Sequence, residues 1–572
     1  MEGLKEIFRR FAPYITRYKF KFFLAILGMI FASLGSAALA LLIDPVLNKI
    51  FIEKNEELLY ILPYAVIVVY GLKSGGAYMQ LYFTSYIGQD IIREFRDRMV
   101  ATLLHLDMAF FNRYRTGELI SRTINDIERI RNVVSNMIPD FITQSIMIVG
   151  LLGVVIYQSP KLAFFALIIL PAAVYPLSIL AKRMKKLSKA SQEKISDISS
   201  TLNEIYTNIE VIKANNAEDK EISHFEKDNQ KYFTLNVKSV KISELTSPLM
   251  ETLGSIGIAV VIIVGGKEVI DGQMSVGGFF SFTTALFMLY TPIKKISNLY
   301  SKMQDAVVAS QRTFELMDKA PSIIGGNKEF PKEVNSLTFQ DVELFYDDKK
   351  ALKEISFFAN RGEMVALVGE SGGGKSSIVN AIMRFYDISS GNILINQNDL
   401  YEFSLKSLRK NIGLVSQRVY IFNQTIAYNV AYGDEIDEQR VIEALKMANA
   451  YEFVQKQKDG IYTVLDEHGT NLSGGQRQRI SIARVLYKDP KIIIFDEATS
   501  ALDNASENII TQMLNKIRKD KILLVIAHRL STIKDADRIV VIEKGKVAGI
   551  GSDESLMREC EIYKTLKGNF KK

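Results

Sequence analysis

A glycine-rich segment in the second half of the chain carries residues of the kind that bind phosphate groups. Residues 369–376 read GESGGGKS, match the pattern GxxxxGK[ST], and directly follow the apolar run 365–368. Glycines let backbone amides approach phosphates, Lys375 neutralises phosphate oxygens, and Ser376 ligates Mg²⁺. The segment therefore predicts a loop that binds a nucleotide and Mg²⁺. Its candidate ligands are Gly369, Glu370, Ser371, Gly372, Gly373, Gly374, Lys375, Ser376 and Ser377.

A pair of acids follows a second apolar run further along the chain. Residues 491–495 read KIIIF and lead into Asp496 and Glu497. Carboxylates at the end of a sheet strand are placed to hold Mg²⁺ and to activate a water molecule. We therefore expect Asp496 to be a second Mg²⁺ ligand and Glu497 to be the general base.

Two more polar residues follow apolar runs in the same way. His528 follows residues 522–527 and Gln417 follows residues 412–415, and both runs read as strands. Ligands of α/β folds collect at the carboxyl ends of strands. We expect both side chains close to the phosphates, with Gln417 in contact with Mg²⁺ or water.

A turn before the acid pair is a second potential anion-binding feature. Residues 473–476 read SGGQ and open a basic helix. The amides at a helix N-terminus attract anions, so Ser473, Gly474, Gly475 and Gln476 are candidate phosphate contacts. Two such features are more than a single active site needs.

The composition divides the chain into two parts. The 572 residues are 48% hydrophobic and 24% charged, with long apolar runs in the first half and short strands in the second. The single cysteine excludes an intramolecular disulfide framework and a cysteine-cluster metal site. We expect a multidomain chain: a transmembrane domain at residues 1–310, a linker at 311–336, and an α/β P-loop domain at 337–572.

The first half contains six runs that are long enough to cross a membrane, for which a helix needs roughly 20 residues. Lysine and arginine concentrate in residues 1–21 and in the connections 88–136 and 181–244. Because such segments stay cytoplasmic, both termini should face the cytoplasm. This placement of the net charge of +7 favours membrane orientation over nucleic-acid binding. The expected six-helix α-helical domain has spans at residues 22–42, 58–87, 137–157, 162–180, 248–265 and 276–292.

Together these motifs resemble those of an ATP-binding cassette (ABC) exporter half-transporter of the type IV fold, over almost the whole chain. Residues 472–476, LSGGQ, are identical to the signature motif of that family. The stretch before the signature departs from the family pattern, because residues 466–469 read DEHG. In the family, the signature motif contacts ATP held by a partner cassette. The resemblance therefore implies a homodimer, or a heterodimer with another chain, that holds two ATP molecules with Mg²⁺.

The resemblance also implies roles for single residues. Glu497 corresponds to the catalytic glutamate, and residues 500–503 to a loop that communicates across the dimer. The midpoints of the two long connections, residues 110–115 and 213–219, correspond to coupling helices. The other implied roles are adenine stacking by Tyr346, coupling to the membrane domain by Gln417, γ-phosphate contact by His528, and cross-dimer communication by Asp503.

Within the exporters, the chain resembles the bacterial lipid A flippase group and its multidrug-exporter relatives. This resemblance implies ATP-driven export or flipping of a lipid-like substrate, lipid A or a related glycolipid, by alternating access. Transport would run from the inner to the outer side of the bacterial inner membrane, with the cassette in the cytoplasm. Multidrug export remains an alternative, followed by peptide export and ATP-gated regulation without pumping. The six spans exclude a soluble ATPase that acts on nucleic acid.

Overall fold

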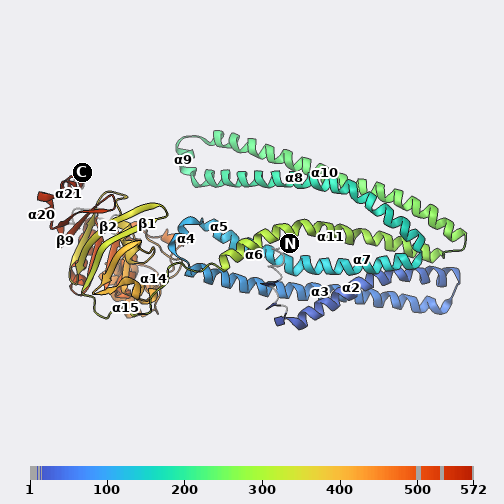
Figure 1. Cartoon of the computed structure of the whole chain (residues 1–572), viewed down its shortest axis with the longest axis horizontal. Coiled ribbons are helices and arrows are strands. Elements are labelled where there is room, and N and C mark those ends of the chain that lie inside the picture. The colour runs from blue at the N-terminus through green and yellow to red at the C-terminus, as the bar shows by residue number, and fades with distance from the viewer. Residues whose placement is uncertain (1–8, 11–12, 15, 497–503, 528–533, 570–572) are drawn as a thin grey trace. The chain divides into compact units, whose positions relative to one another are not determined.

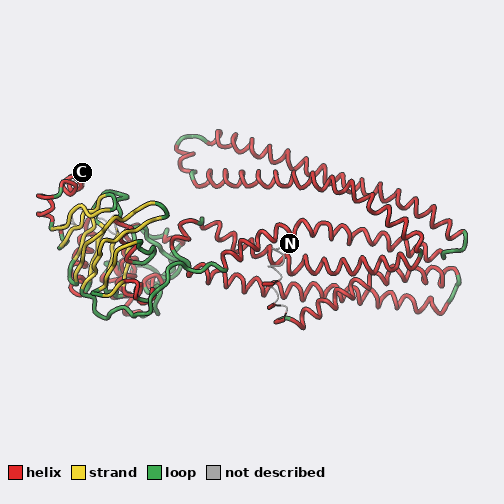
Figure 2. Tube along the Cα trace, viewed as in Figure 1, coloured by secondary structure: helices red, strands yellow, loops and turns green. Residues whose placement is uncertain are grey.

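The computed structural model of the chain describes residues 9–10, 13–14, 16–496, 504–527 and 534–569. Within these ranges, some helical residues are described by their backbone alone. The chain divides into two compact units, Met1–Ala101 with Ile120–Asp318 and Thr102–Leu119 with Lys319–Lys572. The first unit is built of helices, and the second contains the strands (Figures 1 and 2).

Long helices make up the first unit. The ends of α8 and α10 run side by side to a turn that contains α9 (Figure 1). The long helices are α2 (Lys19–Pro45), α3 (Glu56–His105), α7 (Ile138–Gln158), α8 (Pro160–Thr207), α10 (Glu218–Ile270) and α11 (Val276–Met317). The shorter elements are η1 (Val46–Ile52), η2 (Arg122–Asp126), α6 (Ile127–Asn132), η3 (Val133–Met137) and α9 (Ile209–Ala214). A further short helix, α5 (Thr116–Ser121), contains the boundary between the two units.

Small residues let the long helices pack closely. A Cβ atom added at Gly28 of α2 would lie 2.6 Å from the carbonyl oxygen of Gly76 in α3. Such close backbone approach is typical of helices that pack within membranes, where small residues line the contact. A buried apolar cluster that includes Ala40, Leu151 and Phe282 joins α2, α7 and α11.

Several of these helices have the length and apolar character of membrane spans. In the part of the chain that the structure describes, four helical segments meet both criteria: Lys19–Ile52, Glu56–His105, Thr116–Gln158 and Val276–Ile296. The remaining predicted spans, 162–180 and 248–265, lie in α8 and α10 and contain residues described by their backbone alone. The exact domain and span limits given by the sequence stay predictions.

Two sheets form the framework of the second unit. The larger has the order β10-β9-β3-β8-β7-β6, in which all neighbours are parallel except β10 and β9. The smaller is antiparallel, with the order β2-β1-β4-β5. The strands are β1 (Ser336–Tyr346), β2 (Lys349–Asn360), β3 (Met364–Val368), β4 (Ser390–Ile395), β5 (Asn398–Asp399), β6 (Ile412–Val415), β7 (Ile492–Asp496), β8 (Ile522–Ile526), β9 (Arg538–Glu543) and β10 (Lys546–Gly551).

The central strands read as continuous apolar runs because both of their faces are covered. All five residues of β3 and of β8 are buried, as expected for parallel strands with helices or a second sheet on each face. One apolar core lies between the two sheets and α12. A second core joins β6 and β7 to α14–α17.

The second unit also contains helices that lie before, between and after these strands in the chain. They are α4 (Met108–Arg113), α12 (Lys375–Ile382), α13 (Leu405–Asn411), α14 (Ile426–Val430), α15 (Glu438–Met447), α16 (Tyr451–Gln455), α17 (Gly474–Lys488), α18 (Asn504–Ile517), α20 (Asp553–Glu559) and α21 (Glu561–Asn569). Single helical turns are η4 (Leu400–Glu402), η5 (Gly460–Tyr462), η6 (Glu467–Gly469) and η7 (Arg518–Asp520).

Candidate nucleotide-binding site

The glycine-rich segment forms a tight loop between β3 and α12. Gly372 and Gly374 have φ angles of +78° and +116°, which L side chains rarely adopt. The amide of Gly373 donates to the carbonyl of Glu370 at 3.0 Å, and the amide of Gly545 donates to the carbonyl of Gly373 at 2.8 Å. The loop is therefore closed on itself and held against the turn between β9 and β10.

Lys375 lies at the start of α12 and points back over the loop. Its Nζ atom donates to the carbonyls of Gly369 at 2.8 Å and Glu370 at 2.9 Å, and the residue is only 6% exposed. The positive end of the α12 dipole lies at the same place. The loop thus combines a buried cation with a helix N-terminus, which suits a phosphate group.

Gly369 is the position of the loop with the least room for a side chain. An added Cβ atom would lie 2.1 Å from the carbonyl oxygen of Ile542 in β9. We expect Gly369→Ala to destabilise the second unit by about 1–3 kcal/mol, because β3 and β9 must separate to relieve the overlap. Chemical denaturation measures this change in the free energy of unfolding. Gly117→Ala is the matched control, since an added Cβ atom there meets nothing within 4 Å, and an equal loss in both variants would contradict the prediction.

Asp496 ends β7 at the same edge of the sheet as the loop. It pairs with Ile526 of β8, which in turn pairs with Leu367 of β3. Two strand spacings, about 10 Å, therefore separate Asp496 from the end of β3. Gln417 follows β6, in which Val415 pairs with Phe495, so its backbone lies at this edge as well.

Three of the predicted residues lie outside the described residues: Glu497, Asp503 and His528. Of the predicted Mg²⁺ ligands, Ser376 is the second residue of α12, Asp496 ends β7, and Gln417 follows the neighbouring strand β6. A hydroxyl, a carboxylate and an amide oxygen are hard oxygen donors of the kind that Mg²⁺ prefers beside nucleotide phosphates. The residues present therefore fit that ion.

Tyr346 ends β1 and is half-buried. The Nδ2 atom of Asn380 in α12 donates to its hydroxyl at 2.8 Å, and its ring meets that of Tyr386 edge-on at 4.7 Å. The first contact ties the aromatic ring to the helix that begins at the phosphate loop, and the second ties it to the segment that follows this helix. The ring is therefore held at a fixed position relative to that loop.

The SGGQ turn forms the start of α17. The Ser473 hydroxyl accepts from the amide of Gln476 at 3.2 Å, and the Gln476 side chain accepts from the amide of Ser473 at 2.8 Å. This reciprocal capping box fixes the first turn of the helix. Leu472 and Ile480 anchor the segment in the core of α14–α17, whereas the phosphate loop is built on β3, β9 and α12. The two predicted anion-binding features are thus parts of different substructures.

The short helix α4 belongs to the second unit although the sequence places it between two membrane spans. The Nδ2 atom of Asn112 donates to the hydroxyl of Tyr386 at 2.6 Å, and Arg113 forms an ion pair with Asp347. The sequence predicts a turn in the first long connection, residues 88–136, but gives no signal for these particular partners. They lie more than 200 residues away in the chain.

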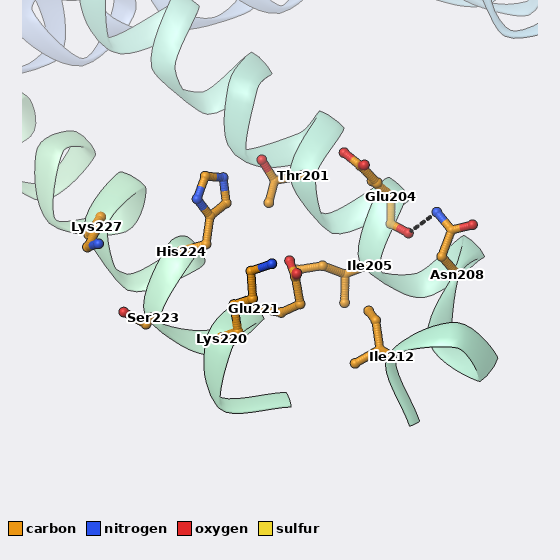
Figure 3. A pocket seen from close by; sticks show the side chains of 10 residues that line it. All are labelled: Thr201, Glu204, Ile205, Asn208, Ile212, Lys220, Glu221, Ser223, His224 and Lys227. Atoms are coloured by element: carbon orange, nitrogen blue, oxygen red, sulfur yellow. Dashed lines mark hydrogen bonds between the residues drawn. The ribbon is translucent and has the colours of Figure 1, made fainter. Parts of the chain in front are cut away.

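A separate pocket of about 500 Å³ lies at the turn between α8 and α10 (Figure 3). Both acidic and basic side chains line it. At the end of α8, the side chain of Asn208 donates to the carbonyl of Glu204 at 2.9 Å. It contains no glycine-rich turn and belongs to the first unit. It is therefore not part of the nucleotide site. Its lining residues are Thr201, Glu204, Ile205, Asn208, Ile212, Lys220, Glu221, Ser223, His224 and Lys227.

Comparisons with known proteins agree with this architecture. The ABC transporter transmembrane region matches residues 22–293, and the ABC transporter domain matches residues 352–500. An ATP-dependent lipid A-core flippase of Syntrophus aciditrophicus (strain SB) is 39% identical over 99% of this chain and 95% of its own. The chain belongs to the ABC transporter family. A second lipid A-core flippase, from Desulfotalea psychrophila, is 38% identical over 98% of this chain and 99% of its own.

Solved structures place this ABC transporter among the exporters. A bacterial Atm1-family ABC exporter with ATP bound has a TM-score of 0.81 and 26% identity, covering 96% of this chain and 98% of that chain. The predicted fold class, a helical membrane domain fused to an α/β cassette, is confirmed. The chain is a multi-pass membrane protein that binds ATP and couples its hydrolysis to transport.

The position of Tyr346 gives this ABC transporter a testable adenine contact. We expect Tyr346→Ala to weaken ATP binding about tenfold, because stacking on a base contributes roughly 1–3 kcal/mol. Fluorescence titration with a labelled ATP measures the change. Tyr346→Phe is the matched variant: it keeps the ring and loses only the bond from Asn380, so equal affinity loss in both variants would argue against stacking.

Proposed function

We propose that the chain is one subunit of a homodimeric flippase that moves lipid A or a related glycolipid from the inner to the outer side of the bacterial inner membrane. The assignment of lipid A as the substrate rests on the similarity, over almost the full chain, to the two proteins named lipid A-core flippases. The phosphate loop, the strand-end carboxylate and the signature turn supply the ATPase. The cassette and both termini lie in the cytoplasm in this proposal.

Each part of the nucleotide site has a distinct task. Lys375 and the loop amides bind the phosphates, and Tyr346 stacks on adenine. Ser376, Asp496 and Gln417 hold Mg²⁺, which when bound neutralises charge on the phosphate oxygens. Glu497 takes a proton from the attacking water, with His528 beside the γ-phosphate.

The signature turn acts on ATP held by the second subunit. The support is its place in the core of α14–α17, separate from the phosphate loop of the same chain. Ser473, Gly474, Gly475 and Gln476 present the N-terminus of α17 to the partner's γ-phosphate, and Asp503 reaches across the dimer. Mass measurement of the purified complex should give twice the 64.5 kDa of one chain; a different second chain in the complex would contradict the homodimer.

Closure of two cassettes on two ATP molecules would turn the membrane cavity outward, and hydrolysis would reset it. The contacts of α4 with Tyr386 and Asp347 support such a route, because they place a segment of the first long connection on the cassette. Transport then follows from alternating access, in which ATP shifts the population of the two states.

ATPase activity in nanodiscs tests the substrate. We expect lipid A to stimulate hydrolysis more strongly than phospholipids or amphipathic drugs, because transport substrates favour the closed state. Strong stimulation by drugs with none by lipid A would replace the lipid assignment by multidrug export.

A further inference from the structure

The side chain of Asp107, the residue before α4, binds a distant segment and not the helix that it precedes. It is the N-cap residue of α4, where a carboxylate ordinarily accepts from an amide of its own first turn, but its side chain makes no cap bond to α4. The carboxylate instead accepts from the amide and hydroxyl of Ser322, at 2.7 Å and 2.5 Å, and from the amide of Ile323 at 3.2 Å. Three donors of the segment after α11 thus converge on one acid of the first long connection.

Arg384 binds the same segment after α11 at Ile324, the residue that follows Ile323. Its Nη2 atom donates to the carbonyl of Ile324 at 3.0 Å, and its Nε atom donates to Asp387 at 3.1 Å. The guanidinium lies 4.2 Å from the centre of the Tyr401 ring. Burial raises the pKa of Tyr401 to about 12, so the ring beside the cation stays neutral even at alkaline pH.

Arg384 occupies a costly environment. It is 1% exposed, and its backbone φ of +48° lies in the left-handed region, which is unfavourable for a residue with a side chain. Its Nη1 atom is buried without a hydrogen-bond partner in the described part of the chain. Strained and unsatisfied groups persist where the surrounding structure needs them, and they gather at functional positions.

The position of Arg384 links it to the phosphate loop. It comes two residues after α12, the helix that begins with Lys375. A helix of this length extends about 12 Å, so a shift at the loop end reaches Arg384 directly. Arg409 fixes the turn after α12 by donating to the carbonyls of Met383 at 3.2 Å and Arg384 at 2.7 Å.

We propose that residues 322–324 form a strap, held by Arg384 on one side and by Asp107 on the other, through which the phosphate loop sets the position of α4. Arg384 and Asp107 are positioning residues in this scheme and touch no nucleotide. The strap is a second connection between the cassette and α4, in addition to the contacts that side chains of α4 make with Tyr386 and Asp347. It acts whatever cargo the membrane domain carries, so it stands apart from the proposed substrate.

Hydrogen exchange of the full-length protein in nanodiscs tests the strap. Exchange is followed in residues 108–113 and 369–376, with and without a non-hydrolysable ATP analogue and Mg²⁺. In the native protein, the analogue should change exchange in both segments. In Asp107→Asn, the response of 108–113 should fall about fivefold, within the usual size of coupling between sites, while that of 369–376 stays. Ser322→Ala, which removes one donor, should weaken the same response less.

The control is Asp437→Asn, at an N-cap aspartate that does cap its own helix, by accepting from the amide of Arg440 at 3.1 Å. It should leave both responses unchanged. A native response of 108–113 in Asp107→Asn overturns the strap. Loss of both responses in that variant also overturns it, because Asp107 would then act on the nucleotide site itself.

Discussion

Lys375→Ala should lower ATP affinity by about 100-fold, because each charge-assisted hydrogen bond to phosphate contributes roughly 1.5–3 kcal/mol. In the structure, the lysine Nζ atom already lies over the loop, bound to the carbonyls of Gly369 and Glu370. Phosphate oxygens would meet this buried cation without a large rearrangement. Titration of the purified dimer with labelled ATP measures the affinity, and hydrolysis should fall in parallel.

Lys410→Ala is the matched control for charge. Lys410 is an exposed lysine of the same unit, near the end of α13. Its loss should leave the affinity within about twofold, because surface charges interact weakly in water. Equal affinity of the Lys375→Ala and native proteins would show that residues 369–376 do not form the ATP site.

Glu497→Gln should lower the rate of ATP hydrolysis by about 10²–10⁴-fold and leave ATP binding intact. A general base supplies an acceleration of this size, and glutamine cannot accept the proton. The side chain keeps its volume, so the site should still close on the nucleotide. Phosphate release gives the rate, and retention of ATP on the purified dimer shows that binding survives.

Glu452→Gln controls for the loss of a carboxylate, since Glu452 is an exposed residue of α16 that pairs only with Lys456 among the described side chains. It should hydrolyse ATP at the native rate. Native hydrolysis by Glu497→Gln would remove Glu497 from the role of general base. Loss of binding in that variant would instead make the residue a ligand.

Local sequence patterns predicted those parts of the site that are built from neighbouring residues. The phosphate loop needs glycines, a lysine and a hydroxyl in one short segment, and Asp496 needs only its place at the end of an apolar run. The sequence likewise predicted that residues 473–476 open a helix, and the structure adds the capping box of Ser473 and Gln476. Such features follow from spacing along the chain, and no knowledge of distant contacts is required.

Contacts between distant segments could not be predicted in this way. Asp107 precedes a short helix, a position typical of an ordinary N-cap. Its carboxylate instead accepts hydrogen bonds from Ser322 and Ile323, more than 200 residues away. Likewise, nothing in the local sequence reveals that Arg384 is buried with a positive φ. Both residues bind the segment after α11, which is distant from each of them in the chain.

Transport in proteoliposomes tests whether this chain moves lipid A across a membrane. The purified protein is reconstituted with lipid A, cassettes facing outward, and the lipid A that a membrane-impermeant reagent can reach is followed after addition of ATP. We expect ATP-dependent movement of lipid A from the cassette side to the opposite leaflet, and no such movement in Glu497→Gln. Rapid ATP hydrolysis by the native protein with no movement of lipid A would contradict this expectation.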